Sequence, residues 1–207
     1  EWKKPEVVNN LTTLTAEALV RPHSFDHNIS TLMGIEGKFL FRFGDDGVPA
    51  NHLQIAGTSS ATNIHINRDV PLEKWIHIAI TYNAAEKNLK AYYNGELVTD
   101  HSMDIGPINW GVPHSDEEDG KPRCFWIGRS YNNDIAEVRI WNRVLSEEEI
   151  NEKDHAYEVD PASDGLVAYW KLNDGINELK DHTINGNNAT PTSSLTWVDV
   201  ALPAKEK

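Results

Sequence analysis

Short runs in which apolar and polar residues alternate, separated by turn-forming residues, recur along the chain from Leu14 onward. This two-residue period is that of β-strands, whose successive side chains point to opposite faces of a sheet. A helical pattern is confined to one short segment that begins at Ser146. The sequence therefore predicts an all-β protein, in which two antiparallel sheets form a β-sandwich with one short accessory helix.

The clearest single signal is a hairpin between residues 89 and 99, where Asn94 and Gly95 separate two strand-like runs. A type I′ turn requires positive φ at both central residues, and asparagine followed by glycine meets that requirement with little strain. A second hairpin is predicted through residues 44–47, after a run that places three phenylalanines on one face. Further strands are expected at residues 14–20, 64–67, 75–82, 125–129, 135–141 and 166–172.

Ser146 is expected to cap the helix, because Glu149 follows it by three residues in the pattern of a capping box. Leu145 and Ile150 flank this pair and can pack on each other as a hydrophobic staple. The acidic residues at positions 147–149 suit the positive end of the helix dipole, so they need no catalytic explanation.

The length of 207 residues suits one all-β domain spanning residues 1–207. The stretch from 165 to 207 is too short for an independent sandwich, yet it contains Trp170 and Trp197. We therefore expect this C-terminal segment to pack back onto the sandwich.

The charge balance argues against several classes of partner. Acidic residues number 32 and basic residues 19, for a formal net charge of -13. Such a chain repels phosphate backbones, so no nucleic-acid partner is expected. No apolar run approaches the roughly twenty residues that cross a bilayer, so this segment is not expected to insert into a membrane. The single cysteine, Cys124, excludes an internal disulfide.

Several stretches, in their order along the chain, resemble the laminin-G-like and pentraxin-like branch of the concanavalin A-like lectin/glucanase superfamily, which includes domains of bacterial surface proteins. The matching stretches are residues 14–22 (LTAEALVRP), 75–83 (WIHIAITYN), 89–98 (LKAYYNGELV), 125–128 (FWIG) and 135–146 (IAEVRIWNRVLS). The resemblance implies a jelly-roll sandwich. It also implies a secreted or cell-surface protein and a glycan as partner, with other domains of the same protein as further partners.

The chain departs from the family pattern in three places. Leu19 stands where a tryptophan is often found, and Ala136 stands where an aspartate is common. Residues 165–190 resemble the stretch that usually begins such a domain, but here they come last. This order suggests an added or permuted segment that closes the sandwich.

The best candidate for sugar recognition is the stretch from 104 to 123, which is longer than an ordinary connection. Sugars bind aromatic platforms that cover their apolar faces, together with planar polar groups that satisfy their hydroxyls. Trp110 and His114 are the candidates in this stretch, with Arg129 and Tyr131 in the following loop. The alternative for Trp110 is packing against the sandwich.

One structural calcium ion is expected from the resemblance, held in the oxygen-rich turn at residues 181–188 by Asp181 and Asn187. The alternative is a turn built from Asx residues alone. Histidines do not predict a second metal site, because the only close pair, His23 and His27, has helical spacing in a segment without helical pattern.

Catalysis of glycoside hydrolysis requires two carboxylates that flank the scissile bond. Asp134 and Glu137 are the nearest pair, but three residues apart on a regular strand they are expected on opposite faces. The sequence therefore favours a non-catalytic carbohydrate-binding module over a glycoside hydrolase. A protein-interaction or spacer domain of a larger surface protein remains the alternative.

Overall fold

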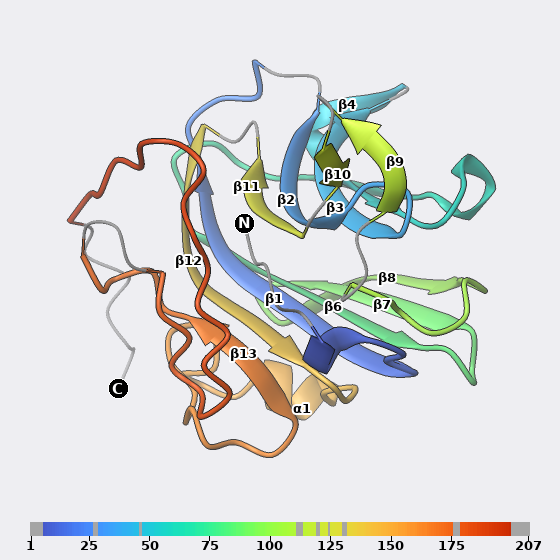
Figure 1. Ribbon diagram of the computed structural model, residues 1–207. Helices are drawn as coiled ribbons and strands as arrows, with labels where there is room; N and C mark the ends of the chain where they lie inside the picture. The colour runs from blue at the N-terminus through green and yellow to red at the C-terminus, as the bar shows by residue number, and fades with distance from the viewer. Residues whose placement is uncertain are drawn as a thin grey trace.

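The computed structural model describes residues 6–26, 29–45, 47–110, 114–118, 121–123, 125–129, 132–175 and 179–199. Two antiparallel sheets pack face to face and enclose the main hydrophobic core (Figure 1). The predicted β-sandwich with a short accessory helix is confirmed. No helix in the described ranges is long and apolar enough to span a bilayer.

The first sheet has six strands. In spatial order they are β13 (Leu166–Trp170), β12 (Asn133–Trp141), β1 (Thr13–Pro22), β6 (Ile76–Asn83), β7 (Asn88–Tyr93) and β8 (Glu96–Ser102). The second sheet has five strands. In spatial order they are β11 (Trp126–Arg129), β2 (Ser30–Ile35), β3 (Phe39–Asp45), β4 (Val48–Ala56) and β5 (Ile64–Asp69).

Smaller elements complete the described chain. Two short 3₁₀ turns cover Glu6–Val8 and Ser60–Thr62. The strands β9 (His114–Glu118) and β10 (Lys121–Arg123) pair with each other inside the stretch that the sequence analysis interpreted as a loop.

Strand β2 was not predicted from the sequence. All six of its residues are buried, so the run lacks the alternation of a strand with one wet face. Gly34 in this strand has a φ of 121°, and a Cβ there would lie 2.3 Å from the carbonyl oxygen of Phe39. The close approach of β2 and β3 therefore requires a glycine at position 34. In a sequence, glycine usually indicates a turn, so it argues against a strand at this position.

The predicted alternation places the expected residues in the core. Phe39, Phe41 and Phe43 of β3 are all buried in the main cluster, as are the alternate residues of β6 from Ile76 to Tyr82. The Asn94–Gly95 hairpin is also confirmed, with φ values of 48° and 81° between β7 and β8.

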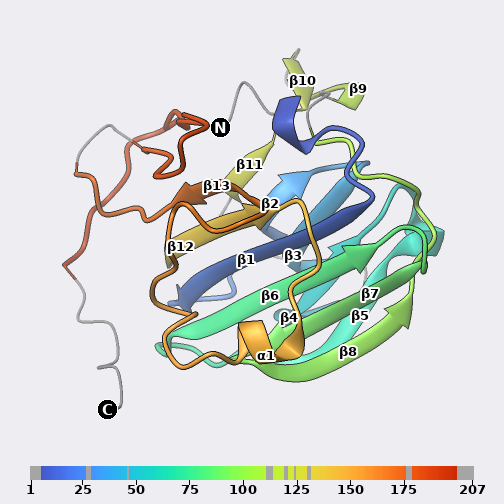
Figure 2. The same cartoon turned by 90° about the horizontal axis from the view of Figure 1, so that it is seen from below.

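The accessory helix α1 (Glu147–Ile150) begins at the predicted cap. The Ser146 hydroxyl accepts the backbone N–H of Glu149 at 3.2 Å, and the Glu149 carboxylate accepts the Ser146 N–H at 2.8 Å. Leu145 and Ile150 are buried in a second apolar cluster with Trp141 and Tyr169. Helix α1 therefore covers the outer face of the six-stranded sheet (Figure 2).

The C-terminal segment contributes β13, which pairs antiparallel with β12 at the edge of the six-stranded sheet. Trp170 is fully buried, and its indole N–H donates to the carbonyl oxygen of Asn187 at 3.0 Å. Trp197 packs, partly buried, against the main core cluster. Residues on both sides of the 181–188 turn therefore contact the sandwich.

Candidate functional site

Polar and aromatic side chains form rows across the outer face of the six-stranded sheet, the face turned away from the five-stranded sheet. Strand pairing places Arg21 opposite Asp134, and Glu17 opposite Arg139, which is in turn opposite Tyr169. The residues between them on each strand point inward to the apolar core. One end of this face is partly open to solvent, and its centre is covered by α1 and the segment that follows.

Glu17 is the centre of the covered part, and its carboxylate is fully buried. Oxygen Oε2 accepts hydrogen bonds from Nε2 of His77 at 3.0 Å and from Nε2 of His155 at 2.9 Å. Oxygen Oε1 accepts from the indole of Trp141 at 2.9 Å and from the Arg139 guanidinium at 3.4 Å. Four donors from β6, β12 and the segment after α1 therefore converge on one carboxylate.

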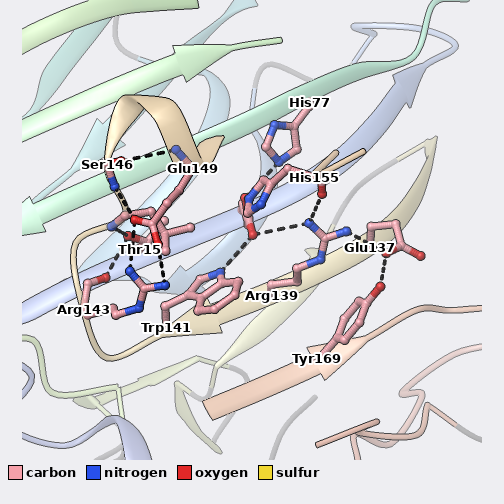
Figure 3. A network of polar contacts seen from close by, with 12 residues as sticks. Thr15, His77, Glu137, Arg139, Trp141, Arg143, Ser146, Glu149, His155 and Tyr169 are labelled. Carbon is pink, nitrogen blue, oxygen red and sulfur yellow. Dashed lines mark hydrogen bonds and ion pairs between the residues drawn. The ribbon is translucent and has the colours of Figure 1, made fainter. Parts of the chain in front are cut away.

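Arg139 links the Glu17 carboxylate to that of Glu137, and Figure 3 shows its contacts with Glu137 and His155. Its guanidinium donates to Glu137 at 2.7 Å and to the backbone carbonyl of His155 at 2.6 Å, and it lies 5.0 Å from the centre of the Tyr169 ring. The Tyr169 hydroxyl donates to the same Glu137 carboxylate. The result is a buried network with two carboxylates and one guanidinium.

The environment sets the charge states of this network. Burial acts to raise the pKa of Glu17, but the Arg139 charge and the hydrogen bonds from His155 and His77 together hold that pKa well below its usual value. Burial lowers the pKa of His77, although Glu17 opposes this effect. Glu17 is therefore a carboxylate and His77 a neutral imidazole at neutral pH.

Helix α1 and the residues on either side of it, here called the cover, are held to the sheet by further polar contacts. The Thr15 hydroxyl donates to the carbonyl of Arg143 at 2.8 Å and accepts the N–H of Leu145 at 2.9 Å. Arg143 in turn makes two hydrogen bonds to the Glu149 carboxylate, at 3.0 and 2.8 Å. A groove of about 380 Å³ runs beside this cover, and Trp141 and His155 are among its lining residues.

The open end of the face carries a second polar group around Trp75. Arg21 forms an ion pair with Asp134, and its guanidinium lies 5.3 Å from the centre of the Trp75 ring. His23 contacts Glu73 at 3.0 Å through Nδ1 and Asp134 at 3.1 Å through Nε2. The hydrogen bonds that the His23 ring makes to the carboxylate of Glu73 and then to that of Asp134 raise the pKa of His23. We refer to these five residues as the open-end cluster.

Trp75 is half-buried with part of its ring exposed, whereas its indole N–H is buried and has no hydrogen-bond partner in the described part of the chain. An aromatic ring beside planar acceptors and donors is the arrangement that recognises sugars. The open-end cluster therefore has the chemical groups of a sugar-binding surface.

Asp134 and Glu137 lie on the same face, contrary to the expectation from sequence. A β-bulge causes this, because three steps along β12 from Ala136 to Arg139 match two steps along β1 from Leu19 to Glu17. Glu137 has a φ of 52° at this bulge. The extra residue shifts the alternation, so that Asp134 and Glu137 both point outward, where each contacts an arginine.

Trp110, expected as a sugar platform, lies in the core instead. Its side chain is fully buried, and its indole N–H donates to the carbonyl of Phe39 at 2.7 Å. Its ring packs edge-on against Phe125, with centroids 4.9 Å apart. The aromatic cluster of β3 needs a large partner at this point, and Trp110 therefore presents no ring face to a ligand.

The other predicted sugar contacts are placed only in part. His114 begins β9, and its side chain lies outside what the structure describes. Arg129 ends β11, with its guanidinium 5.6 Å from the centre of the Trp126 ring. Tyr131 lies outside the described residues. Of the three, only Arg129 has a side chain within the described part of the structure.

The predicted calcium ligands form a hydrogen-bonded turn. Oδ1 of Asp181 accepts the backbone N–H groups of Tyr169 and Thr183, at 3.0 and 2.9 Å. Oδ2 accepts the Thr183 hydroxyl and the Asn187 N–H, both at 2.8 Å. The Asn187 amide donates to the carbonyl of Val167 at 2.8 Å. Four donors therefore occupy the Asp181 carboxylate, which argues against this residue as a calcium ligand in the turn as it stands.

Sequence reasoning missed the network around Glu17. Glu17, His77 and Arg139 each stand between apolar neighbours on a strand, which is the ordinary pattern of a solvated outer face. His155 is distant from them in sequence. One signal in the sequence could have indicated the network. Leu145, Ile150 and Val159 are apolar and must pack against something, and the outer face of a sheet is the surface that they cover.

Comparisons with known proteins agree with this architecture. A laminin-G-like family described as the concanavalin A-like lectin/glucanases superfamily matches residues 3–151. A protein from Bacteroides ovatus, described as a proposed carbohydrate-binding protein, is 27% identical, with a TM-score of 0.71 over 90% of this chain. The chain spans 56% of the length of that protein. No curated protein sequence matches this chain significantly.

Two further solved structures match this chain with lower scores. A pentraxin from Limulus polyphemus is 14% identical with a TM-score of 0.47, over 70% of each chain. A sialidase from Trypanosoma rangeli is 18% identical with a TM-score of 0.46, over 67% of this chain and 22% of the sialidase. Likeness at these scores says nothing about function. From the family match and the sandwich together, the chain belongs to the concanavalin A-like lectin/glucanase superfamily.

Proposed function

We propose that this chain is a non-catalytic carbohydrate-binding module of a secreted or cell-surface bacterial protein, which captures glycans through the open-end cluster. The observation that carries the proposal is the likeness to the proposed carbohydrate-binding protein of Bacteroides ovatus, which extends over 90% of this chain. Identity of 27% at a TM-score of 0.71 is the reason to transfer the general class of ligand.

Trp75 supplies the apolar contact in this proposal. Its ring is half-buried and held by the Arg21 guanidinium, so little side-chain freedom is lost when a sugar stacks on the exposed part. Asp134 and Glu73 supply planar acceptors for sugar hydroxyls, and His23, which contacts both carboxylates, holds them in place.

The charge of the surface selects the class of glycan. In the open-end cluster, the carboxylates of Glu73 and Asp134 are offset by the Arg21 guanidinium and the His23 imidazole, while the whole chain has a formal charge of -13. Glycans rich in uronic or sialic acids would be repelled over distances of about one Debye length. The proposed ligand is therefore a neutral oligosaccharide or polysaccharide.

Binding without hydrolysis is favoured by the state of the outer-face carboxylates. Asp134 forms an ion pair with Arg21, and Glu17 and Glu137 share Arg139 in the buried network. A general acid must reach the glycosidic oxygen, and a buried carboxylate that is already bound to arginine does not.

Affinity electrophoresis and a glycan array with neutral polysaccharides test the proposal. The chain is expected to bind at least one neutral glycan, and Trp75→Ala is expected to weaken that binding at least tenfold. Trp126→Ala is the matched control, because Trp126 is also half-buried under an arginine but lies on β11. Near-UV circular dichroism establishes that both variants keep the native fold.

Loss of binding in Trp126→Ala, with full binding in Trp75→Ala, would move the site to β11 and overturn the assignment to the open end. A chain that binds no glycan would overturn the function and favour a spacer or protein-interaction domain. Release of reducing ends from the same polysaccharides, abolished by Glu137→Gln, would show an enzyme instead.

A further inference from the structure

Three side chains from three separate elements meet on the covered part of the outer face. Glu17 comes from β1, His77 from β6 and His155 from the segment after α1. Their ligand-type atoms all lie within 4.8 Å of one another, and all three side chains are buried. We propose that Glu17, His77 and His155 form a binding site for one zinc ion.

The geometry of the two imidazoles supports a shared ion. Nε2 of His77 and Nε2 of His155 both face the same oxygen, Oε2 of Glu17, at 3.0 and 2.9 Å. In a tetrahedral zinc site with bonds near 2.0–2.1 Å, neighbouring ligand atoms lie about 3.3 Å apart. Entry of zinc therefore requires each nitrogen–oxygen pair to separate by only a few tenths of an ångström, and the two nitrogens already lie within 4.8 Å of each other.

The second oxygen of the Glu17 carboxylate, Oε1, takes part in a hydrogen bond that orients the whole group. Oε1 of Glu17 accepts from the Trp141 indole at 2.9 Å, which fixes the plane of the carboxylate and leaves Oε2 toward the histidines. The Trp141 ring also stacks on the His155 ring, with centroids 6.2 Å apart. Such secondary contacts orient metal ligands in known sites.

The nearby arginine does not prevent cation binding. Arg139 lies on the Oε1 side of Glu17, at 3.4 Å, and is more closely paired with Glu137 at 2.7 Å. The carboxylates of Glu17 and Glu137 share the single Arg139 guanidinium, so a cation on the Oε2 side of Glu17 would face a carboxylate that has no arginine of its own. A buried charge of this kind is stabilised by a cation.

The ligand set favours zinc over calcium. Imidazole nitrogen with one carboxylate oxygen is a typical zinc set, whereas calcium takes six to eight oxygens. Both imidazoles present Nε2, a usual zinc-binding atom, toward the same carboxylate oxygen. Three protein ligands leave one position of the tetrahedron for water or a ligand atom from the adjacent groove, which His155 lines.

Zinc binding would also attach the cover more firmly to the sheet. Glu17 and His77 belong to the sheet, whereas His155 belongs to the segment after α1. A bound zinc ion would join that segment to β1 and β6 by metal bonds rather than by hydrogen bonds alone. Binding energy then stabilises the folded chain by mass action.

The test uses the full chain without a histidine tag, freed of metal by a chelator. Zinc is titrated by isothermal calorimetry, and cobalt(II) is added separately to detect the visible absorption of tetrahedral coordination. One zinc ion per chain is expected. At a zinc concentration a hundred times Kd, the midpoint of thermal unfolding should rise by roughly 5–10 °C.

His155→Gln and His77→Gln each keep an amide donor for Glu17 and remove a metal ligand, so both are expected to abolish stoichiometric binding while retaining near-UV circular dichroism. His52→Gln is the matched control, because His52 and His65 form a separate histidine pair on the five-stranded sheet, 2.8 Å apart. It should bind zinc as the unchanged chain does. Absence of zinc binding in the unchanged chain, or loss of binding in His52→Gln but not in His155→Gln, would overturn the proposal and leave a purely hydrogen-bonded network.

Discussion

At the scale of single residues, Glu17 shows how much a buried charge depends on its partners. The carboxylate is fully buried, and Arg139 is the ionised group that faces it. Such a pair does not by itself stabilise a fold, since both charges give up their hydration. Removing one partner is costly nevertheless, because the other charge stays buried without compensation.

Glu17→Gln, studied in the presence of a chelator, is therefore expected to lower the free energy of unfolding by about 3–5 kcal/mol. Urea unfolding followed by tryptophan fluorescence measures this. Glu96→Gln is the control, because Glu96 also pairs with an arginine, Arg68, but on the exposed surface. That change should have little effect on the unfolding midpoint. Similar losses in both variants would contradict the assigned burial.

His23 carries a pH dependence of predictable sign. Its pKa is raised by Glu73 and Asp134, so the folded chain holds the proton more tightly than the unfolded chain. The resulting stabilisation is present below the unfolded pKa of about 6.5 and disappears as the pH rises through the folded pKa. One third of the side chain is exposed, so solvent screening limits the effect to less than about 1 kcal/mol.

His23→Gln should accordingly be less stable than the unchanged chain at pH 5.5, and the difference should vanish at pH values well above the folded pKa. Unfolding midpoints of the two chains at several pH values provide the measurement. A difference that stays constant with pH would show that the imidazole acts through packing rather than through its charge.

At the scale of elements, local chemistry explains the hairpin and the helix, whereas the turn at residues 181–188 depends on one buried acceptor. Asp181 accepts from Tyr169 on β13 as well as from Thr183 and Asn187 within the turn. The turn is thus attached to the edge strand through its carboxylate. The side chain replaces the backbone pairing that a regular connection would have.

Asp181→Asn is expected to destabilise the chain by about 2–3 kcal/mol, because the new amide group faces N–H donors that then lack an acceptor. The loss should be equal in calcium and in chelator, since these donors occupy the site that calcium would need. Thermal unfolding in the two buffers measures both points. Asp164→Asn, at an exposed aspartate, is the control. Stabilisation of the unchanged chain by calcium at this turn would contradict the account.

At the scale of the whole molecule, β13 closes one edge of the six-stranded sheet and contributes to both of its faces. Trp170 packs in the main core, and Tyr169 packs in the outer cluster with Trp141 and α1. A chain that ends at Asp164 would expose the edge of β12 and lose both aromatic residues. It is expected to lose cooperative unfolding and to aggregate.

Differential scanning calorimetry and near-UV circular dichroism test this expectation. A chain that ends at Ala189 is the comparison, because it keeps β13 and the Asp181 turn and lacks only the later residues, Trp197 among them. It should unfold cooperatively at a modestly lower midpoint. A cooperative transition in the shorter chain would show that the first 164 residues fold independently.

The sequence by itself determined the strand periodicity, the Asn94–Gly95 hairpin, the capped helix and the membership in a β-sandwich family, because each depends on residues close together in the chain. It misplaced Trp110 because composition does not show which aromatic residue fills the gap beside Phe39. It also placed Asp134 and Glu137 on opposite faces, because a β-bulge is set by the partner strand.

Only the tertiary structure decided the candidate sites. Glu17, His77 and His155 meet because β1 pairs with β6 and the segment after α1 folds back over both. Arg21 reaches Asp134 and Trp75 only when three strands align in register. The physical reason is that hydrogen bonds and charge interactions act over a few ångströms of space, and a sandwich brings together residues that are far apart in sequence.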